Sequence, residues 1–286
     1  MWSLARQLLV GSLAVWSVAA DISVSIEAVR DDGVDFSSDI KLVPVPPRER
    51  WQHGTRHRTR PSSGGSTNNK RNTISYSGNW CGASQHSTAK DPIVSAFSYF
   101  TAPNLSLRKG IPPPQYAAAW VGVDGAECKQ ALLQAGATTV VNSNGGQSAW
   151  AWWQWYPAAS YKIGNLPVKP GDWMSVSVTV LSPTSGKLVI TNAQQGYEVA
   201  ITVTGGPKLC QLDAEWLVED FYDPDDGQVN FARFSDLWFL EAQAKTASGK
   251  TIGIDNAAMV YLQNENGTVV CKAEKWDNAN FVATSP

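Results

Sequence analysis

Short stretches in which apolar and polar positions alternate dominate the chain from residue 72 to the C-terminus. Val, Thr and aromatic residues are frequent in them. Alternation with a period of two places the apolar side chains on one face of a β-strand. No long segment of this region has the period of an amphipathic helix. The stretches with the alternating pattern are 95–103, 115–123, 131–141, 173–181, 187–193, 197–204, 214–222 and 257–264.

Turn-forming residues separate these predicted strands. Gly-Gly, Pro-Gly and Gly-Gly-Pro sequences occur at 145–146, 170–171 and 205–207, and Pro-Thr-Ser-Gly occurs at 183–186. Many short strands at regular spacing are typical of a β-sandwich or barrel. We therefore predict that residues 72–286 form an all-β domain, built as a two-sheet antiparallel β-sandwich.

The first 20 residues have a different character. Arg6 precedes an apolar run that begins at Leu8, and small residues follow as far as Ala20. This order is typical of a secretory signal peptide with cleavage after Ala20. The apolar run is too short to be a membrane anchor. We predict a signal peptide at residues 1–20, a secreted extracellular protein and no membrane partner.

A basic stretch lies between the signal peptide and the predicted sandwich. Residues 41–72 hold eight lysine and arginine side chains and one acid, Glu49. Proline, glycine and serine are also abundant there, so the stretch cannot bury enough apolar surface to fold alone. We predict that residues 21–71 are a basic, largely disordered prosegment that is processed at Lys70-Arg71. The following domain holds 18 acidic and 13 basic side chains, so we expect the prosegment to act as its inhibitor at neutral pH.

Composition excludes some other classes of protein. The formal net charge of −2 gives no indication of a nucleic-acid partner.

Sequons at Asn104 and Asn266 predict glycosylation on surface loops. The cysteines are too far apart for a CxxC metal or redox motif, and secretion favours disulfides instead. These cysteines are Cys81, Cys128, Cys210 and Cys271.

The densest aromatic stretch is SAWAWWQWYP at 148–157. On a strand its side chains fall into two sets. One set is apolar, contains Trp153 and Trp155, and is expected in the core. The other set combines rings with an amide and a phenol, which suits the wall of a cleft. It consists of Trp150, Trp152, Gln154 and Tyr156.

Two glutamates share one face of the strand predicted at 214–222. Glu215 and Glu219 are four residues apart, with Leu217 between them on that face. The pattern alone is compatible with a solvated outer face or with functional carboxylates. The same reasoning places Trp120 and Asp124 on one face of the strand near residue 120.

Four motifs carry a resemblance to a known family. NWCG at 79–82, AWVGVDGAECKQALLQAG at 119–136, WQWYP at 153–157 and LCQLDAEWLVEDF at 209–221 resemble the fungal glutamic peptidases, or eqolisins. The resemblance implies a concanavalin A-like, lectin-like jelly roll and a pepstatin-insensitive acid endopeptidase. It also implies peptide substrates, and neither a metal nor a cofactor. We expect the protein to be a monomer.

The resemblance assigns roles at the matching positions. It implies that Glu219 and Gln134 are the catalytic pair and that Cys128 and Cys210 form a disulfide. A second bridge would then join Cys81 to Cys271. The expected substrate-binding residues are Trp80, Trp120, Asp124, Trp152, Gln154 and Tyr156.

This chain departs from the family pattern in the groove. Gln154 stands where the family commonly has Glu, and Trp150 and Thr138 stand where it often has acids. We therefore expect a less acidic groove and an altered pH profile.

Two other functions are compatible with the sequence. One is a carbohydrate-active or lectin-like sandwich, because Trp-rich clefts bind sugars. A glycosidase would require two carboxylates flanking the bond, for which Glu219 and Asp124 are candidates. The other is a catalytically inactive binding protein of eqolisin ancestry.

Overall fold

Strands account for nearly all regular structure in the residues that the structure, a computed structural model, describes: 16–19, 22–45, 73–223 and 227–286. There is no α-helix in these ranges, and the only helical element is the 3₁₀ turn η1 (Ser37–Asp39). Within them, no helix has the length and apolar character needed to cross a membrane.

The strands follow the predicted alternation. In chain order they are β1 (Trp16–Ala19), β2 (Ile22–Arg30), β3 (Lys41–Val45), β4 (Ile74–Ser77), β5 (Trp80–His86), β6 (Ile93–Thr101), β7 (Leu105–Ser106), β8 (Gln115–Val123), β9 (Leu132–Val141), β10 (Gln147–Tyr156), β11 (Ser160–Gly164), β12 (Trp173–Ser182), β13 (Ser185–Asn192), β14 (Tyr197–Thr204), β15 (Asp213–Glu219), β16 (Tyr222–Asp223), β17 (Gly227–Gln228), β18 (Arg233–Phe234), β19 (Leu237–Thr246), β20 (Thr251–Ile252), β21 (Ala258–Gln263), β22 (Val269–Lys275) and β23 (Phe281–Thr284).

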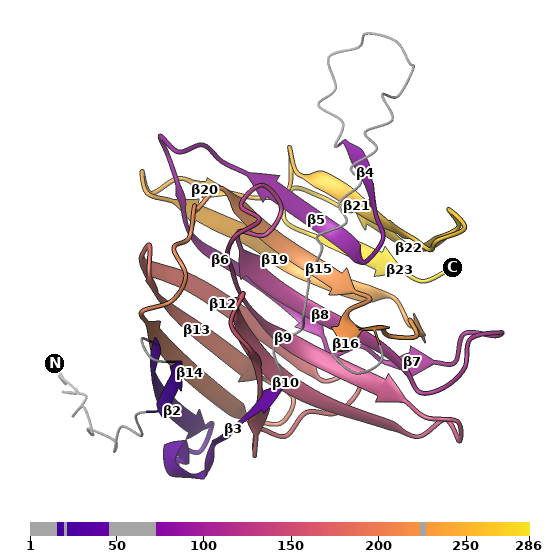
Figure 1. Cartoon of the computed structure of the whole chain (residues 1–286), viewed down its shortest axis with the longest axis horizontal. Helices are drawn as coiled ribbons and strands as arrows, with labels where there is room; N and C mark the ends of the chain where they lie inside the picture. Colours follow the sequence, from indigo (N-terminus) through magenta and orange to yellow (C-terminus); the bar gives the residue numbers. More distant parts are fainter. Residues whose placement is uncertain (1–15, 20–21, 46–72, 224–226) are drawn as a thin grey trace, which may run out of the picture.

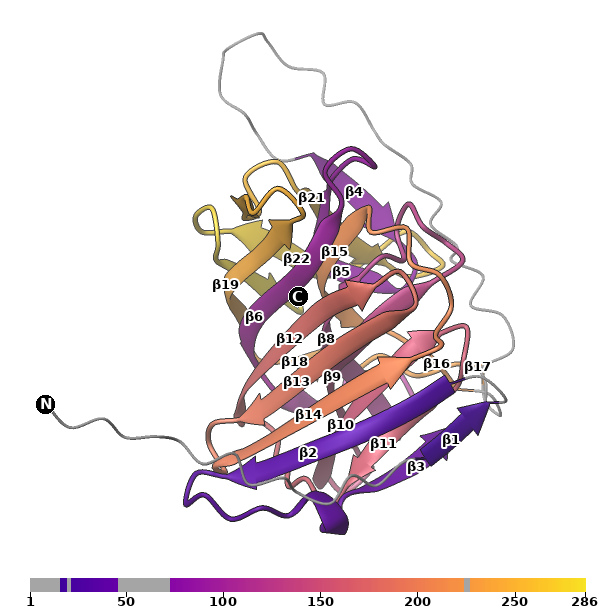
Figure 2. The same ribbon diagram turned by 90° about the vertical axis from the view of Figure 1, so that its left-hand side faces the viewer.

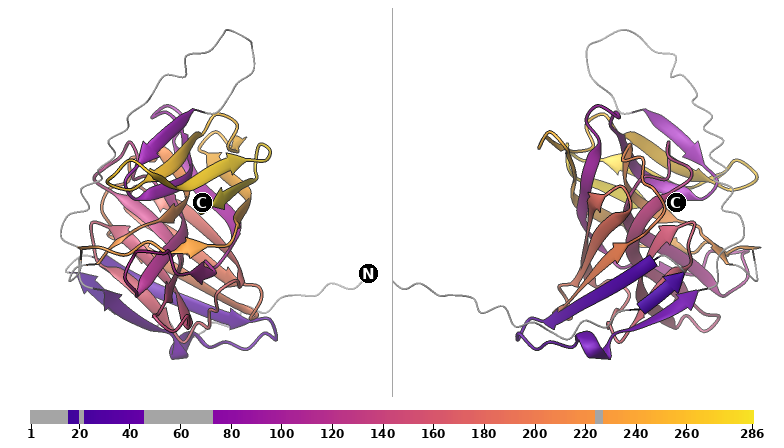
Figure 3. Two further views of the ribbon diagram at one scale, coloured as in Figure 1. Left: turned by 90° about the vertical axis from the view of Figure 1, so that its right-hand side faces the viewer. Right: turned by 60° about the vertical axis from the view of Figure 1, so that its left-hand side comes forward.

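The long strands pack as two layers (Figures 1 and 3). The first layer has the order β1-β2-β14-β13-β12-β6-β19-β23. The second has the order β3-β11-β10-β9-β8-β15-β5-β21-β4. Neighbouring strands within each layer are antiparallel, except that β21 and β4 are parallel. Strand β22 pairs with both β21 and β23 and so joins the two layers. The predicted two-sheet sandwich is confirmed.

The main core lies between the two layers and contains the apolar set of β10. Trp153 and Trp155 are each 1 % exposed and belong to this core, as the alternation predicts. The Trp155 ring requires a glycine beside it. A Cβ atom on Gly206 would lie 2.5 Å from the ring, closer than a carbon contact allows.

The N-terminal segment corrects one prediction. Residues 22–45 were expected to be part of a largely disordered prosegment, but they form β2, η1 and β3. The physical reason is local: ISVSIEAVR at 22–30 alternates, and its apolar side chains are buried in the main core. The basic composition lies mainly C-terminal to Val45. Residues 46–72, with the predicted processing site, and most of the predicted signal peptide are outside the described residues.

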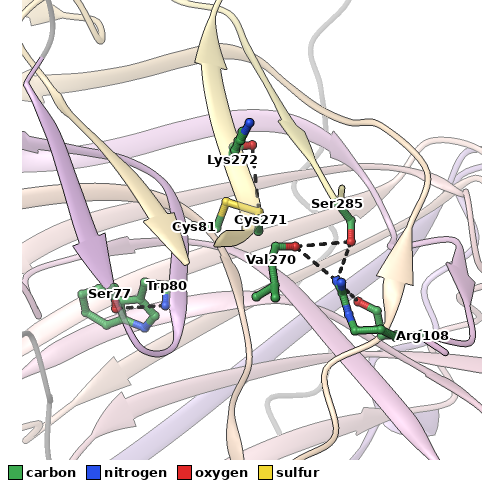
Figure 4. Close-up of a disulfide and its surroundings, with 9 residues drawn as sticks. Ser77, Trp80, Cys81, Arg108, Val270, Cys271, Lys272 and Ser285 are labelled. Carbon is green, nitrogen blue, oxygen red and sulfur yellow. Dashed lines mark hydrogen bonds between the residues drawn. A yellow bond between two sulfur atoms is a disulfide. The ribbon is translucent and has the colours of Figure 1, made fainter. Parts of the chain in front are cut away.

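Two disulfides connect distant strands. Cys81 of β5 is bonded to Cys271 of β22, and Cys128 is bonded to Cys210 (Figure 4 shows the first pair). Both predicted pairings are present. Near the first bridge, Arg108 donates hydrogen bonds to the Val270 carbonyl and the Ser285 hydroxyl, at 3.1 and 2.7 Å, which ties the C-terminal end to the sandwich.

The two predicted glycosylation positions are at the surface. Asn104 and Asn266 are both exposed and lie in loops. Their modification stays a prediction.

Candidate active site

The register of the second layer brings residues from distant parts of the sequence into rows. The row through Gln134 runs across β15, β8, β9 and β10, and a second row runs through Glu219. Since Gln134 and Glu219 come from β9 and β15, with β8 between them, the register explains how they reach one site. The first row is Glu215, Gly122, Gln134 and Gln154, and the second is Glu219, Ala118, Thr138 and Trp150.

Residues from both rows line a cavity of about 220 Å³ on the face of the second layer that points away from the main core. Aromatic rings form much of its wall, and Gln134 and Glu219 both line it. The lining residues are Val45, Tyr116, Ala118, Gln134, Thr138, Trp150, Trp152, Gln154, Ser160, Glu219 and Phe221.

Glu219 is held from behind by two indole rings. Its side chain is only 1 % exposed. The Trp120 Nε1 donates to Oε2 at 2.9 Å, and the Trp80 Nε1 donates to Oε1 at 3.2 Å. The Asn79 amide lies at the limit of hydrogen bonding to Oε1, at 3.5 Å. One donor on each oxygen fixes the plane of the carboxylate, so its orientation does not depend on a bound substrate.

A glycine makes room for this arrangement. Gly136 of β9 lies directly opposite Trp120 of β8. A Cβ atom at Gly136 would be 2.6 Å from the Trp120 Cβ and 2.1 Å from the Ala119 carbonyl oxygen. Any side chain there would push Trp120 away from Glu219.

A chain of amides fixes the orientation of Gln134. The Gln154 Nε2 donates to the Ala158 carbonyl oxygen at 3.0 Å, so the Gln154 Oε1 must point the other way. That oxygen accepts a hydrogen bond from the Gln134 Nε2 at 2.9 Å. The Gln134 Oε1 is buried and has no hydrogen-bond partner among the described residues. A buried amide oxygen without a partner is costly unless water or a ligand reaches it.

Other buried carboxyls surround the site. Burial raises the pKa of Glu215 well above its ordinary value, and the charges of Asp213 and Asp124 raise it further. Burial likewise raises the pKa of Asp220 well above its usual range, with the neighbouring Glu219 as a second cause. Neither Glu215 nor Asp220 lines the cavity. Because their pKa values are raised, both carboxyls favour the protonated form at the acidic pH where carboxyl groups ordinarily titrate.

Asp124 does not lie where it was expected. It is fully buried and is not one of the residues that line the cavity. Its carboxylate accepts backbone hydrogen bonds from Cys210, Gln211 and Leu212, at 2.7, 2.9 and 2.8 Å. Asp124 thus fixes the loop that carries one disulfide cysteine, and the structure gives it no contact with the proposed groove.

The remaining predicted substrate-binding residues take three different positions. Trp152 and Gln154 line the cavity. Trp80 and Trp120 are 2 % and 0 % exposed and donate hydrogen bonds to the Glu219 carboxylate, so they hold it in place and do not line the cavity. Tyr156 packs against the apolar cluster that contains Trp80, Trp120 and Trp152, and it does not line the cavity.

Sequence reasoning missed several residues of the wall. Tyr116 and Phe221 pack edge to face with ring centres 5.7 Å apart, and Ser160 and Val45 complete the side beyond β10. Alternation could have identified Tyr116, which shares a face with Trp120 on β8. Val45 could not be found, because its strand lay in a segment expected to be disordered.

One group of potential metal ligands occurs among the described residues. It consists of Asp124, Cys128 and Cys210. Both cysteines are in a disulfide, and the Asp124 carboxylate is already occupied by three backbone N–H groups. These residues do not suit a metal ion.

Comparison with known proteins identifies the family. A model of the peptidase A4 family matches residues 78–285, which is most of the chain. The chain belongs to the peptidase A4 family, the eqolisins. It is therefore a glutamic endopeptidase, a hydrolase of peptide bonds.

Two curated eqolisins are similar in sequence. Aspergillopepsin-2 from Aspergillus niger is 32% identical over 214 residues, which cover 68% of this chain and 73% of the relative. Scytalidopepsin B from Scytalidium lignicola is 31% identical over 159 residues, which cover 52% of this chain and 60% of the relative. The second match thus spans less than two thirds of scytalidopepsin B.

Solved eqolisin structures have the same fold. The crystal structure of scytalido-glutamic peptidase with a peptide-based transition-state analogue has a TM-score of 0.63 at 25% identity. It covers 73% of this chain and 98% of the other chain. The crystal structure of aspergilloglutamic peptidase from Aspergillus niger has a TM-score of 0.56 at 32% identity, and covers 60% of this chain and 99% of the other.

Proposed function

We propose that this eqolisin is a secreted acid endopeptidase in which Glu219 and Gln134 hydrolyse peptide bonds through an activated water. One observation carries the proposal: a carboxylate fixed by two indole N–H groups and an amide fixed by a second amide line the same cavity. Peptide substrates are supported by the peptide-based analogue bound to scytalido-glutamic peptidase.

The reaction needs no covalent intermediate. The Glu219 carboxylate removes a proton from water, and the hydroxide formed attacks the carbonyl carbon of the scissile bond. The Gln134 Nε2 has a second N–H, which donates to the oxygen that becomes negative. Glu219 then returns the proton to the leaving nitrogen, the C–N bond breaks, and an acid and an amine are released.

The unpartnered Gln134 Oε1 has a role in this scheme. It is buried, belongs to a side chain that lines the cavity, and can accept a hydrogen bond from the attacking water. Water held between this oxygen and the Glu219 carboxylate would be oriented for attack. Because Glu219 must start ionised and later carry a proton, the mechanism favours pH values near the carboxyl range, about 3 to 5.

The glycosidase alternative lacks its second carboxylate. Among the described residues that line the cavity, Glu219 is the only acid, and Asp124, the partner considered for it, accepts backbone hydrogen bonds elsewhere. Hydrolysis of glycosides generally uses two carboxyls on opposite sides of the bond.

Secretion and autoinhibition complete the proposal. The apolar N-terminus and two disulfides support secretion. The basic stretch, now confined to residues 46–71, would bind the acidic domain at neutral pH and weaken as carboxylates take up protons. A synthetic 46–71 peptide should inhibit at pH 6, much less at pH 3, and less at either pH in high salt.

Digestion of casein at pH 3 in the presence of pepstatin tests the proposed function. We expect cleavage that pepstatin does not reduce, and no release of reducing sugar from polysaccharides. Absence of proteolysis by folded, processed protein would instead indicate an inactive binding protein of eqolisin ancestry.

A further inference from the structure

The N-terminal strands form one edge of both layers of the sandwich. β2 pairs with β14 over eight residues, from Ser23 to Arg30, and β3 pairs with β11 over five, from Lys41 to Val45. Figure 2 shows both indigo strands on the same side of the sandwich, with the short strand β1 beside β2. A single segment, residues 22–45, thus extends both sheets on this side, and in the first sheet only the short strand β1 (Trp16–Ala19) lies beyond it.

This segment is also part of the main core. Ile22, Val24, Ile26 and Ala28 point inward from β2, and none is more than 8 % exposed. The Phe36 ring packs edge to face on Tyr197 of β14, with ring centres 5.2 Å apart. Removing the segment would expose apolar surface on both layers and leave β14 and β11 as unpaired edges, both of which are unfavourable in water.

The segment is additional to the family's common domain. The family model begins at residue 78, and scytalido-glutamic peptidase is 98% covered although only 73% of this chain takes part in the match. No cysteine lies in residues 22–45, and both disulfides are formed within 81–271. If the chain is cut after Val45, hydrogen bonds and apolar contacts alone would keep the segment in place.

The last residue of β3 reaches the active site. Val45 is paired with Ser160, which is paired with Gln154, which is paired with Gln134. This row runs straight from the N-terminal segment to the catalytic amide, and all four side chains line the cavity. Val45 therefore forms the wall of the cleft on the side away from Glu219.

We infer that residues 22–45 are a permanent part of the mature peptidase, retained as a noncovalently bound chain after processing between Val45 and residue 73. Val45, at the end of this segment, is then a specificity-determining residue. The segment supplies strand edges that the common domain lacks, and its end narrows the cleft beside Gln134. The specificity half of this inference rests on the proposed function. The retention half does not.

Retention is tested on the full-length protein with the recognition site of a sequence-specific protease inserted between Gly64 and Gly65. After cutting, we expect both pieces to elute together at a 1:1 ratio on gel filtration at pH 4 and to separate only in denaturant. Ile26→Asp, which places a charge in the core, should release the small piece. Val29→Asp, at an exposed position of the same strand, should not. Separation of the unmutated pieces in native buffer would overturn the inference.

Specificity is tested by profiling cleavage sites in a peptide library with Val45→Trp and, as the control, Val29→Trp. We expect Val45→Trp to disfavour large side chains at one substrate position by at least about fivefold in relative kcat/KM, and the control to match the wild type. A profile unchanged by Val45→Trp, or a uniform loss at all sites, would refute the role of Val45. If the wild type cleaves no peptide, the proposed function fails, while the gel-filtration result still decides whether the segment is retained.

Discussion

Glu215 and Glu219 are the same residue type on the same face of β15, but their surroundings differ completely. Glu219 lines the cavity and accepts a hydrogen bond from an indole on each oxygen. Glu215 is fully buried, and neither of its oxygens accepts a hydrogen bond of ordinary geometry among the described residues, although the Ala126 backbone N–H slightly opposes the rise of its pKa. One strand thus holds a hydrogen-bonded carboxylate that lines the cavity and a carboxyl whose surroundings favour the neutral form.

The difference indicates that hydrogen-bond donors and access to the cavity distinguish two buried acids that the sequence pattern makes equivalent. A carboxylate that must take and return a proton needs a fixed orientation and contact with the reacting water. Glu219 has both. Glu215 has neither, and its surroundings favour the form that cannot act as a base.

Among the residues that surround Glu219, the largest effect is expected for Gln134. Gln134→Ala removes the proposed donor to the oxyanion and should lower kcat by about a hundredfold or more. The control is Gln85→Ala, because Gln85 is also buried with an unpartnered Oε1 but does not line the cavity. Peptide hydrolysis at pH 4 measures both. Comparable losses in the two variants would show that the effect is structural.

Glu215 should affect stability in a pH-dependent way. Its pKa is raised in the folded state, so the unfolded chain releases the proton first as pH rises, and the folded state loses stability above about pH 4.3. The loss is at most about 1.4 kcal/mol per pH unit, until the raised pKa is reached. Glu215→Gln should therefore raise the melting temperature at pH 7 more than at pH 3. An equal shift at both pH values would mean that Glu215 is not neutral in the native protein.

The indole behind Glu219 should contribute to the rate but little to binding. Trp120→Phe removes the hydrogen bond to Oε2 and keeps most of the packing, so we expect kcat to fall about tenfold with KM nearly unchanged. Trp216→Phe is the control, since Trp216 is on the opposite face of β15 and donates to the Phe97 carbonyl at 2.8 Å. It should lower stability and leave kcat unchanged.

The smallest effect is expected at Gln154. Its amide donates to Ala158 and accepts from Gln134 at any pH. In Gln154→Glu, a protonated acid can replace both bonds, but an ionised one cannot donate to Ala158. At pH 3 the activity of the variant should stay within about threefold of the wild type. As the pH rises, its activity should begin to fall at a lower pH than that of the wild type. Identical pH–rate profiles for Gln154→Glu and the wild type would show that Gln154 does not position Gln134.

Much of this architecture could be predicted from sequence because strand alternation is a local signal. The two faces of β10 were correctly distinguished by it, and the motifs indicated Gln134 and Glu219. Asp124 could not be placed in the same way, because its partners are backbone amides more than 80 residues away. β2 carried a clear alternating pattern, but the basic stretch after it led to an expectation of disorder for the whole segment.

Glu219, and not Glu215, is the carboxyl that we propose performs the reaction. The most direct measurement is kcat/KM of Glu219→Gln and Glu215→Gln on one peptide at pH 4, with folding of both confirmed by circular dichroism. We predict a loss of at least about a thousandfold for Glu219→Gln and less than about threefold for Glu215→Gln. Substantial activity in Glu219→Gln, or an equally large loss in well-folded Glu215→Gln, would contradict the assignment.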